Sequence, residues 1–552
     1  MIQKTSKIGM RYKALIRLGV AVGSCVAMTV LGASAEPARS VIPRPQQIEI
    51  GEGGYSVDEK TRIYLVSDGS EHGRHIGVRL AELFEERHGV DLEVVSTTAK
   101  EGFRLFLGER DKGGEVVIDA IAGKDEGYVL ESNQEGVAVG SHSIKGLWNG
   151  AMTLIQLVED GRVRSCRIVD FPRYEMRGFM IDAGRAPVRI GHLKRIIRVC
   201  SAFKLNFLLY RESDNELNAV RYDLNPLGSK NPEALTMDEV RELIRYAALH
   251  GIEVIPEIEG LGHAGARRMH YPELVRGTAA KPYGKNVHGK SLGMHYTRAH
   301  LLPSDERSLK LLDSVFREWF QVMECEYVHL GMDEIRMPKE DQAKHLEVLI
   351  PRVQKLAKEY GIEPKFIVWS DAPETPEAYK DIVIRSPWSY GNRALDGGMS
   401  KHLKHQKVPN LLGEGCKEKV LMGAGSSSSH GPGSKCGYEK SFRNLAEWAI
   451  LGKDRENFIG MTVCQWHGNQ IDQWFPDFVV GADVSWNPPV EVVAYKELKG
   501  RVDRKLSMFN DVAAPKESEL TPAAWHGVWL EGGKWGELIA PLPVPMNMRG
   551  EK

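Results

Sequence analysis

The feature that most limits the fold of this chain is a repeated strand, loop and helix pattern, which begins at Arg177 and ends near Leu506. Short apolar runs alternate with amphipathic segments, as is typical of parallel strands joined by helices. Eight runs have this character: RGFMIDA, LNFLLY, IEVIPEI, EYVHLGM, KFIVWS, DIVIRS, the stretch around VPNLLGE, and FIGMTVCQW. The pattern predicts an α/β protein with a (β/α)8 TIM barrel over residues 173–507.

One helix of this region has a clear start signal. Thr236 and Glu239 have the spacing of a capping box, in which each side chain binds the backbone N–H of the other residue. A helix is predicted over DEVRELIRYAAL, ending before Gly251 and leading into IEVIPEI. The whole region exceeds the roughly 250 residues of a minimal barrel, so we expect long loops at one face.

The residues before the barrel have a different pattern. Residues 41–172 alternate short β-like runs with helical stretches such as GLWNGAMTLIQLVED, and they predict a small α+β domain without a catalytic cluster. After the barrel, residues 508–552 are rich in Pro and Gly but hold Trp525, Trp529 and Trp535. We expect this C-terminal tail to pack on the barrel.

The first 35 residues are typical of a targeting signal. Five basic and no acidic residues precede the run LGVAVGSCVAMTVLG, which ends at the A-x-A pattern of Ala33 to Ala35. The run is rich in glycine and lacks the roughly 20 strongly apolar residues of a membrane span. The pattern predicts a cleaved signal peptide over 1–35, a periplasmic or secreted protein, and no stable membrane span after cleavage.

Composition excludes several classes of protein. Lys and Arg number 73 against 74 Asp and Glu, and 27% of residues are charged while 42% are hydrophobic. This balance is that of a globular protein and argues against a nucleic-acid partner. None of the cysteine spacings is a CxxC or zinc pattern, and Cys325 and Cys464 lie in apolar runs that favour buried free thiols. We expect neither a metal nor a cofactor.

Polar and aromatic side chains follow most of the predicted barrel strands. Because the carboxyl ends of barrel strands meet at one face, these groups should converge there. They are Asp182, Arg185, Asp214, Glu257, Glu259, His263, His329, Asp333, Glu334, Trp369, Asp371, Trp388 and Trp466. Indole rings can stack on a sugar, a guanidinium can bind its hydroxyls, and a carboxyl can protonate the leaving oxygen. The set therefore favours carbohydrate hydrolysis.

Several of these residues also have ordinary structural explanations. Asp182 is typical of a local hydrogen-bond acceptor, and His329 of a core histidine within its strand. Asp333 and Glu334 could be the acidic first turn of a helix, where negative charge is favoured. Trp486 is expected to serve packing. The residue types alone leave these alternatives open.

A longer motif bears on that choice. HLGMDE, residues 329–334, closely resembles the H-x-G-x-D-E signature of family 20 glycoside hydrolases, the β-N-acetylhexosaminidases. IPRP at residues 42–45, RGFMIDAGR, KLN at residues 204–206 and IEVIPEIEGLGHAGA resemble further segments of that family in the same order. The resemblance covers nearly all of residues 41–470, and it implies a non-catalytic N-terminal domain before a catalytic barrel.

The resemblance also implies roles for individual residues. Glu334 is the expected general acid and base, and Asp333 the group that binds the acetamido N–H of the substrate. His263 and Asp214 are the expected pair behind the acid. Substrate binding is expected from Arg185 at subsite −1, and from Trp369, Trp388 and Trp466. The implied reaction is retaining and exo-acting, with the 2-acetamido oxygen of a terminal β-GlcNAc or β-GalNAc of a glycan as nucleophile.

The chain departs from the family pattern in three places. Arg211 stands in the polar run YRESD where the family commonly has H-x-T-D-D or Y-T-E-D. The segment GAGSSSSHGPGS, expected after strand seven, holds no aromatic residue for the acetamido pocket. Gly468 stands two residues after Trp466, where the family often has an acid, and Asp472 is the expected substitute.

Two other functions stay open on these grounds. The altered motifs are compatible with a barrel that binds amino-sugar glycans without hydrolysing them. A β-glycosidase with two enzyme carboxylates would need Glu257 or Glu259 as its nucleophile opposite Glu334.

Overall fold

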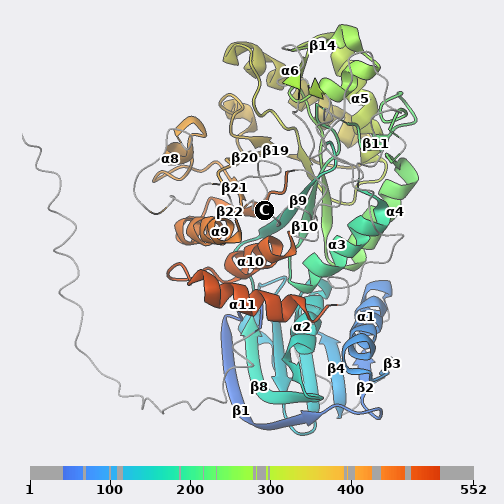
Figure 1. The fold of residues 1–552 in the computed structure, drawn as a ribbon, viewed down its shortest axis with the longest axis vertical. Coiled ribbons are helices and arrows are strands. Elements are labelled where there is room, and N and C mark those ends of the chain that lie inside the picture. The colour runs from blue at the N-terminus through green and yellow to red at the C-terminus, as the bar shows by residue number, and fades with distance from the viewer. Residues whose placement is uncertain are drawn as a thin grey trace, which may run out of the picture.

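The computed structural model describes residues 41–509, except for 66–69, 98–100, 109–115, 186–187, 216, 232, 278–280, 283–293, 296–298, 391–394, 396–403, 426–436 and 467–473. The predicted signal segment, Asp472 and the tryptophans of the C-terminal tail lie outside the described residues. Two units are visible in Figure 1. The lower unit is a sheet with its helices, and the upper unit is a barrel.

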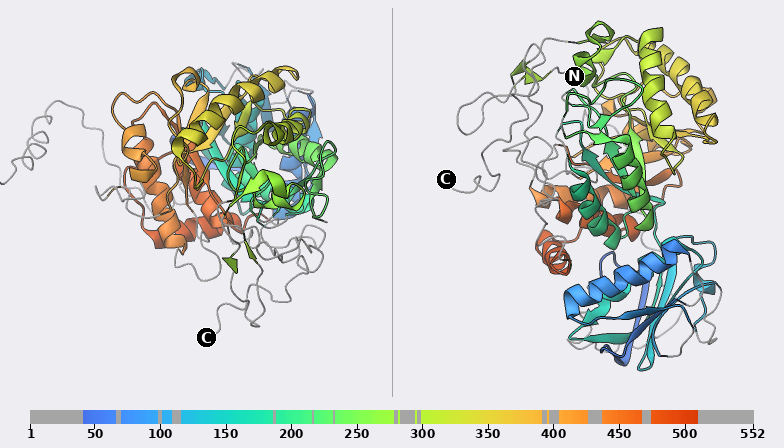
Figure 2. Two further views of the ribbon diagram at one scale, coloured as in Figure 1. Left: turned by 90° about the horizontal axis from the view of Figure 1, so that it is seen from above. Right: turned by 90° about the vertical axis from the view of Figure 1, so that its right-hand side faces the viewer.

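The N-terminal unit is a mixed sheet with two helices. Its strands lie in the order β1-β8-β5-β6-β4-β2-β3, and β7 pairs with β8. The bounds are β1 Gln47–Ser56, β2 Arg62–Leu65, β3 Glu93–Val95, β4 Gly102–Leu107, β5 Tyr128–Ser132, β6 Gly136–Ser141, β7 Val158–Glu159 and β8 Arg162–Asp170. The helices are α1 Glu71–His88 and α2 Ile144–Leu157. Figure 2 shows α1 lying across the sheet on the side that faces the barrel.

Helix α2 connects this sheet to the barrel. Its apolar side chains pack on β4, β5, β6 and β8. Trp148 in α2 donates its indole N–H to the Ser201 carbonyl over 3.2 Å, and the carbonyl of Gln156 accepts from the Lys505 ammonium over 3.1 Å. The N-terminal unit therefore has polar as well as apolar contacts with the barrel.

The second unit is a closed parallel barrel with the strand order β9-β10-β13-β18-β19-β20-β21-β22. The strands are β9 Met176–Asp182, β10 Phe207–Arg211, β13 Glu253–Glu257, β18 Tyr327–His329, β19 Lys365–Trp369, β20 Val383–Ser386, β21 Val420–Ala424 and β22 Phe458–Val463. The helices around it are α3 Ile190–Ala202, α4 Met237–Leu249, α5 Glu306–Phe320, α6 Lys339–Lys358, α8 Val408–Leu411, α9 Tyr438–Gly452, α10 Phe475–Trp486 and α11 Tyr495–Leu506. The predicted TIM barrel after a small domain is confirmed.

The long connections include short paired strands. These are β11 Val220–Arg221 with β12 Leu235–Thr236, β14 Val275–Arg276 with β17 His300–Leu301, and β15 Lys281–Pro282 with β16 Met294–His295. Helix α4 starts with the predicted capping box, since Thr236 accepts from the Glu239 N–H over 3.2 Å and Glu239 accepts from the Thr236 N–H over 2.8 Å.

One strand prediction is wrong. The stretch around VPNLLGE forms the short helix α8 rather than strand seven, which is β21. Pro409 lies in the first turn of α8, a position where proline's missing N–H costs nothing. A short apolar run cannot by itself distinguish one buried helical turn from a strand.

The barrel interior is arranged in layers, because side chains of a strand alternate between its two faces. Phe207 and Leu209 of β10 point into an interior cluster together with Met180, Ile255 and Ile367 of neighbouring strands. The next inward position on β10 is Arg211, which pairs in register with Asp182 on one side and Glu257 on the other. A polar layer therefore lies directly above an apolar one.

Candidate active site

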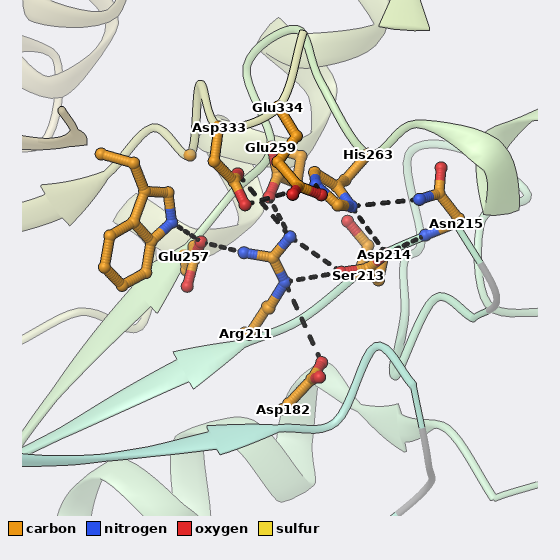
Figure 3. Close-up of polar contacts among 12 residues, drawn as sticks. Asp182, Arg211, Ser213, Asp214, Asn215, Glu257, Glu259, His263, Asp333 and Glu334 are labelled. Atoms are coloured by element: carbon orange, nitrogen blue, oxygen red, sulfur yellow. Dashed lines mark hydrogen bonds and ion pairs between the residues drawn. The ribbon is translucent and has the colours of Figure 1, made fainter. Parts of the chain in front are cut away.

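Arg211 lies at the centre of this polar layer, surrounded by carboxylates from several strands (Figure 3). Its Nε atom is 2.8 Å from Asp214 Oδ2, its Nη2 atom is 2.6 Å from Glu259 Oε1, and its Nη1 atom contacts Glu257. Asp182 and Asp333 lie 3.9 Å away. Burial alone would lower the pKa of Arg211, but these carboxylates outweigh it and hold the pKa well above its ordinary value. The guanidinium is a permanent buried cation.

Glu257 and Glu259 are fully buried beside this cation. Burial raises the pKa of Glu257 to about 7 and that of Glu259 to about 8, and Arg211 opposes both shifts. Glu257 Oε1 accepts the indole N–H of Trp369 over 2.7 Å. Glu257 Oε2 and Glu259 Oε2 have no hydrogen bond within the described part of the chain. Burial and the neighbouring guanidinium therefore act in opposite directions on the proton affinity of both carboxyl groups, and burial has the larger effect.

His263 connects two other carboxylates. Its Nδ1 atom is 3.0 Å from Asp214 Oδ1, and its Nε2 atom is 3.2 Å from Asp333 Oδ2. Burial would lower the pKa of His263, but Asp214 and Asp333 outweigh it and raise the pKa well above its ordinary value. The side chain is therefore an imidazolium, and Glu334 Oε2 lies 3.7 Å from Nε2.

Asp214 and Asp333 are held as anions by these cations. Burial would raise both pKa values, but Arg185, His263 and Arg211 lower that of Asp214, and His263 and Arg211 lower that of Asp333. Asp214 and Asp333 both contact the His263 imidazolium, whereas Glu257 and Glu259 do not.

The loop after β18 presents the two adjacent acids. Gly331, Met332 and Glu334 have positive φ angles of 65°, 80° and 52°, a conformation that is costly for a side-chain-bearing residue and concentrates at functional sites. A Cβ atom at Gly331 would lie 2.2 Å from Glu259 Oε2, so any other residue there would displace the Glu259 carboxyl as well as adopt a strained φ angle. Glu334 reaches solvent, with 55% of its side chain exposed.

This loop decides between two sequence interpretations. Asp333 and Glu334 do not form the first turn of a helix, because α6 begins at Lys339. His329 is a core histidine as expected, because it is fully buried and its Nδ1 accepts the Gly331 N–H over 3.0 Å. Burial lowers the pKa of His329 to about 3, so it carries no charge.

Arg185 lies at the edge of the same cluster. It donates to Asp182 over 2.9 Å and pairs with Asp214 over 3.1 Å, while its guanidinium lies 5.0 Å from the ring centre of Trp466. Its side chain remains 14% exposed. Asp182 therefore serves as a local acceptor, as expected, and the guanidinium of Arg185 retains an exposed portion.

Aromatic rings form one side of the site. Trp466 donates its indole N–H to the Tyr390 hydroxyl over 2.8 Å, and Tyr390 stacks on Trp388 at 5.7 Å. Trp388 in turn donates to Asp371 over 2.9 Å. Trp369 is fully buried, with its ring 5.9 Å from that of Trp466.

Tyr390 was missed by the sequence argument, which looked for an aromatic residue only after strand seven. It follows β20, the sixth strand of the barrel. The available signal was the spacing Trp388-Ser389-Tyr390, since alternate residues of an extended segment share a face. The predicted site residues Arg185, Asp214, His263, Asp333, Glu334, Trp369, Trp388 and Trp466 lie at the same end of the barrel, whereas Asp472 lies outside the described residues.

Three neighbouring carboxyl groups have the spacing of a cation site. Oxygen atoms of Glu257, Glu259 and Asp333 lie within 4.8 Å of one another. The Arg211 guanidinium contacts all three residues, so this chain supplies a cation from its own sequence.

At the carboxyl end of the TIM barrel, the half-exposed Glu334 carboxyl lies beside the buried Asp333 carboxylate and the His263 imidazolium, and indole rings form one side of the site. This combination is that of a carbohydrate-hydrolysing enzyme. Comparison with known families agrees. Residues 174–388 match the catalytic domain of glycosyl hydrolase family 20, and residues 38–171 match domain 2 of that family. The chain belongs to glycoside hydrolase family 20 and is a glycoside hydrolase of the β-hexosaminidase type.

Individual relatives are distant. A β-N-acetylhexosaminidase of Cellulomonas fimi is 25% identical over 89% of this chain and 99% of its own length. A β-hexosaminidase of Porphyromonas gingivalis is 29% identical over 43% of this chain, and the match spans only 32% of that relative. The family 20 β-N-acetylhexosaminidase structure from Streptomyces coelicolor A3(2) superposes with a TM-score of 0.67 at 24% identity, covering 86% of this chain and 97% of that one. The structural likeness establishes the shared fold.

Proposed function

We propose that this protein is a retaining exo-β-N-acetylhexosaminidase that removes terminal β-GlcNAc or β-GalNAc from glycans with the substrate's own acetamido group as nucleophile. The observation that carries the proposal is the division of the carboxyl groups. Glu334 is half-exposed and Asp333 beside it is anionic, whereas Glu257 and Glu259 are buried against Arg211.

The reaction follows from that division. Glu334 donates its proton to the glycosidic oxygen as the C1–O bond breaks, and the acetamido carbonyl oxygen forms a bond to C1. The resulting oxazolinium ion is positively charged, and the Asp333 carboxylate accepts its N–H and stabilises it. Water then attacks C1, the bond between C1 and the acetamido oxygen breaks to restore the acetamido group, and the Glu334 carboxylate takes a proton from the water. Two inversions at C1 give net retention and return Glu334 to its acid form.

The surrounding residues support these steps. His263 binds Asp333 from one side, and its Nε2 atom lies 3.7 Å from Glu334 Oε2. Arg185 offers an oriented guanidinium for sugar hydroxyls, because Asp182 and Asp214 hold its fork. Trp388, Trp466 and the hydroxyl of Tyr390 are the groups that we assign to the sugar ring and its acetamido arm.

A two-carboxylate β-glycosidase is the second candidate. It requires an anionic nucleophile about 5–5.5 Å from the acid carboxyl. Glu257 and Glu259 are poor candidates, because both are fully buried, raised in pKa and in contact with a guanidinium. A binding protein without hydrolysis is favoured by the altered motifs around Arg211 and in the segment GAGSSSSHGPGS expected after strand seven.

The discriminating experiment measures nitrophenol release from aryl β-GlcNAc, β-GalNAc and β-Glc. Cleavage of only the acetamido sugars, with strong inhibition by a GlcNAc-thiazoline, is the expected result. Equal cleavage of β-Glc, together with a fluorosugar label on Glu257 or Glu259, would establish the two-carboxylate mechanism. No cleavage of any glycoside would establish a binding protein.

We also propose export, which rests on the basic and apolar pattern of residues 1–35. Among the described residues, no helix combines the length and apolar character that crossing a bilayer requires. N-terminal sequencing of protein from the native cell should begin after Ala35, and a mature protein that retains Lys4 would contradict the proposal.

A further inference from the structure

Arg211 occupies a position that the hydrolytic scheme above does not use. It is fully buried, and of the groups proposed to contact the sugar it approaches Asp333, from which Nη2 lies 3.9 Å away, and the ring of Trp466. A buried charge is costly, and a cluster that only needed packing could be replaced as a whole by apolar side chains without loss of stability. The cation therefore calls for a role.

The contacts of Arg211 show what it organises. Its Nε and Nη2 atoms both lie 2.8 Å from Asp214 Oδ2, and Asp214 in turn holds His263 through Oδ1. Asp214 also binds Arg185 over 3.1 Å. One guanidinium thus supports both the imidazolium behind the acid and the arginine that faces the sugar.

The other contacts of Arg211 engage the competing carboxyl groups. The Glu257 carboxyl contacts Nη1, and the Glu259 carboxyl contacts Nη2. The plane of the guanidinium lies 5.4 Å from the ring centre of Trp466, which closes one of its faces. A lysine has neither the planar fork nor the reach to make these contacts together.

We propose that Arg211 is a positioning residue for hydrolysis: it fixes the Asp214, His263 and Asp333 chain in its charged arrangement and keeps Glu257 and Glu259 out of the reaction. This inference rests on the proposed hexosaminidase function. Arg211 departs from the family motif. In this proposal it keeps Glu257 and Glu259 apart from the two carboxyl groups that take part in the reaction, Asp333 and Glu334.

The test compares Arg211→Met, Arg211→Lys and the control Arg177→Met. Arg177 is also fully buried and pairs with Glu126 over 2.7 Å. It lies at the amino end of β9, whereas Arg211 lies at the carboxyl end of β10. For each variant, kcat and KM on aryl β-GlcNAc are measured between pH 4 and pH 9, with thermal unfolding recorded at each pH.

We expect Arg211→Met to lower kcat at least 100-fold with a smaller change in KM. Its acidic limb of kcat/KM should move toward neutral pH, because Asp333 loses one cation that keeps it ionised. The titratable and charged groups that face Asp333 are His263, Arg211, Asp214, Glu334, Glu257, Glu259, His329 and Tyr390. Arg211→Lys retains the charge and should restore the wild-type limb while kcat stays about 10-fold low.

The control should lose thermal stability and keep its wild-type pH profile. If Arg211→Met does not fold, Arg211→Lys alone decides: an unchanged kcat would overturn the proposal. A fall in kcat of Arg211→Met no larger than that of Arg177→Met, with an unmoved acidic limb, would also overturn it. Failure of the wild type to cleave any acetamido glycoside would instead refute the proposed function, so the two failures are distinguishable.

Discussion

Two buried clusters of cations and carboxylates lie at opposite ends of the barrel, and they are built differently. At the amino end, Lys204 pairs with Asp170 over 3.1 Å, and Asp170 also accepts from the Tyr128 hydroxyl over 2.6 Å and the Trp486 indole N–H over 2.8 Å. At the carboxyl end, Arg211 lies among five carboxyl groups, with several oxygens lacking a hydrogen bond within the described residues.

The difference separates a structural cluster from a reactive one. The pair at the amino end joins the N-terminal sheet to the barrel, and its carboxylate is fully satisfied. The cluster at the carboxyl end is crowded with negative charge, so proton affinities there diverge between neighbouring groups. Divergent pKa values within one cluster are what acid and base catalysis requires. Substitutions should therefore damage stability at one end and rate at the other.

The largest effect is expected from Glu334→Gln at the reactive end. Turnover of a glycoside with a poor leaving group should fall by about 10⁴-fold, whereas an activated aryl glycoside should suffer less, because it needs little proton donation. Thermal unfolding should not change, since the side chain is 55% exposed. Glu340→Gln, an exposed acid in α6, is the matched control. Equal losses on both substrates would contradict the assignment of Glu334 as the acid.

The next effect belongs to the structural end. Lys204→Met leaves the Asp170 carboxylate buried without its cation and should lower the free energy of unfolding by about 3–5 kcal/mol. The folded fraction should keep a nearly wild-type kcat. Lys365→Met, which breaks an exposed pair with Glu326, should cost under about 1 kcal/mol. Urea unfolding together with kinetics checks both, and a large fall in kcat for Lys204→Met would erase the distinction between the two ends.

Asp333→Asn tests the charge rather than the shape of the reactive cluster. Its kcat should fall by about 10²–10³-fold, because the amide cannot stabilise a positively charged oxazolinium ion. A thiazoline inhibitor should bind the variant much more weakly than the wild type, since it resembles that intermediate. If the thiazoline inhibits the variant as strongly as it inhibits the wild type, Asp333 does not bind the acetamido group.

The smallest effect, when counted per pH unit, concerns Glu259. Burial raises the pKa of Glu259 from 4.5 to about 8. Between these values the unfolded chain is ionised there and the folded chain is protonated, so this residue makes stability fall as pH rises, by at most about 1.4 kcal/mol per pH unit. Glu259→Gln removes the penalty, and its Tm relative to the wild type should rise from pH 5 to pH 8. A Tm difference that is constant over this window would show that Glu259 is ionised in the folded protein.

Local signals predicted much of this architecture. The capping box at Thr236 gave the start of α4, and apolar runs located most of the barrel strands, because both depend on neighbours within a few residues. The prediction of strand seven failed for the same reason, since VPNLLGE and VLMGA both contain short apolar runs, and only packing assigns one to α8 and the other to β21. Tyr390 follows the sixth strand rather than the seventh, and its hydrogen bond to Trp466 forms only when the barrel closes.

The sequence by itself determined the fold class, the family resemblance and the identity of the adjacent acids in HLGMDE, because each of these depends on residue order or on short-range periodicity. Only the tertiary structure decided which carboxyl groups have raised pKa values and which have lowered ones. Asp333 and Glu259 are the same kind of group in sequence, but one faces His263 while the other is buried against Arg211. Proton affinity depends on burial and on charges a few ångströms away, and the closure of the barrel brings those charges together from separate strands.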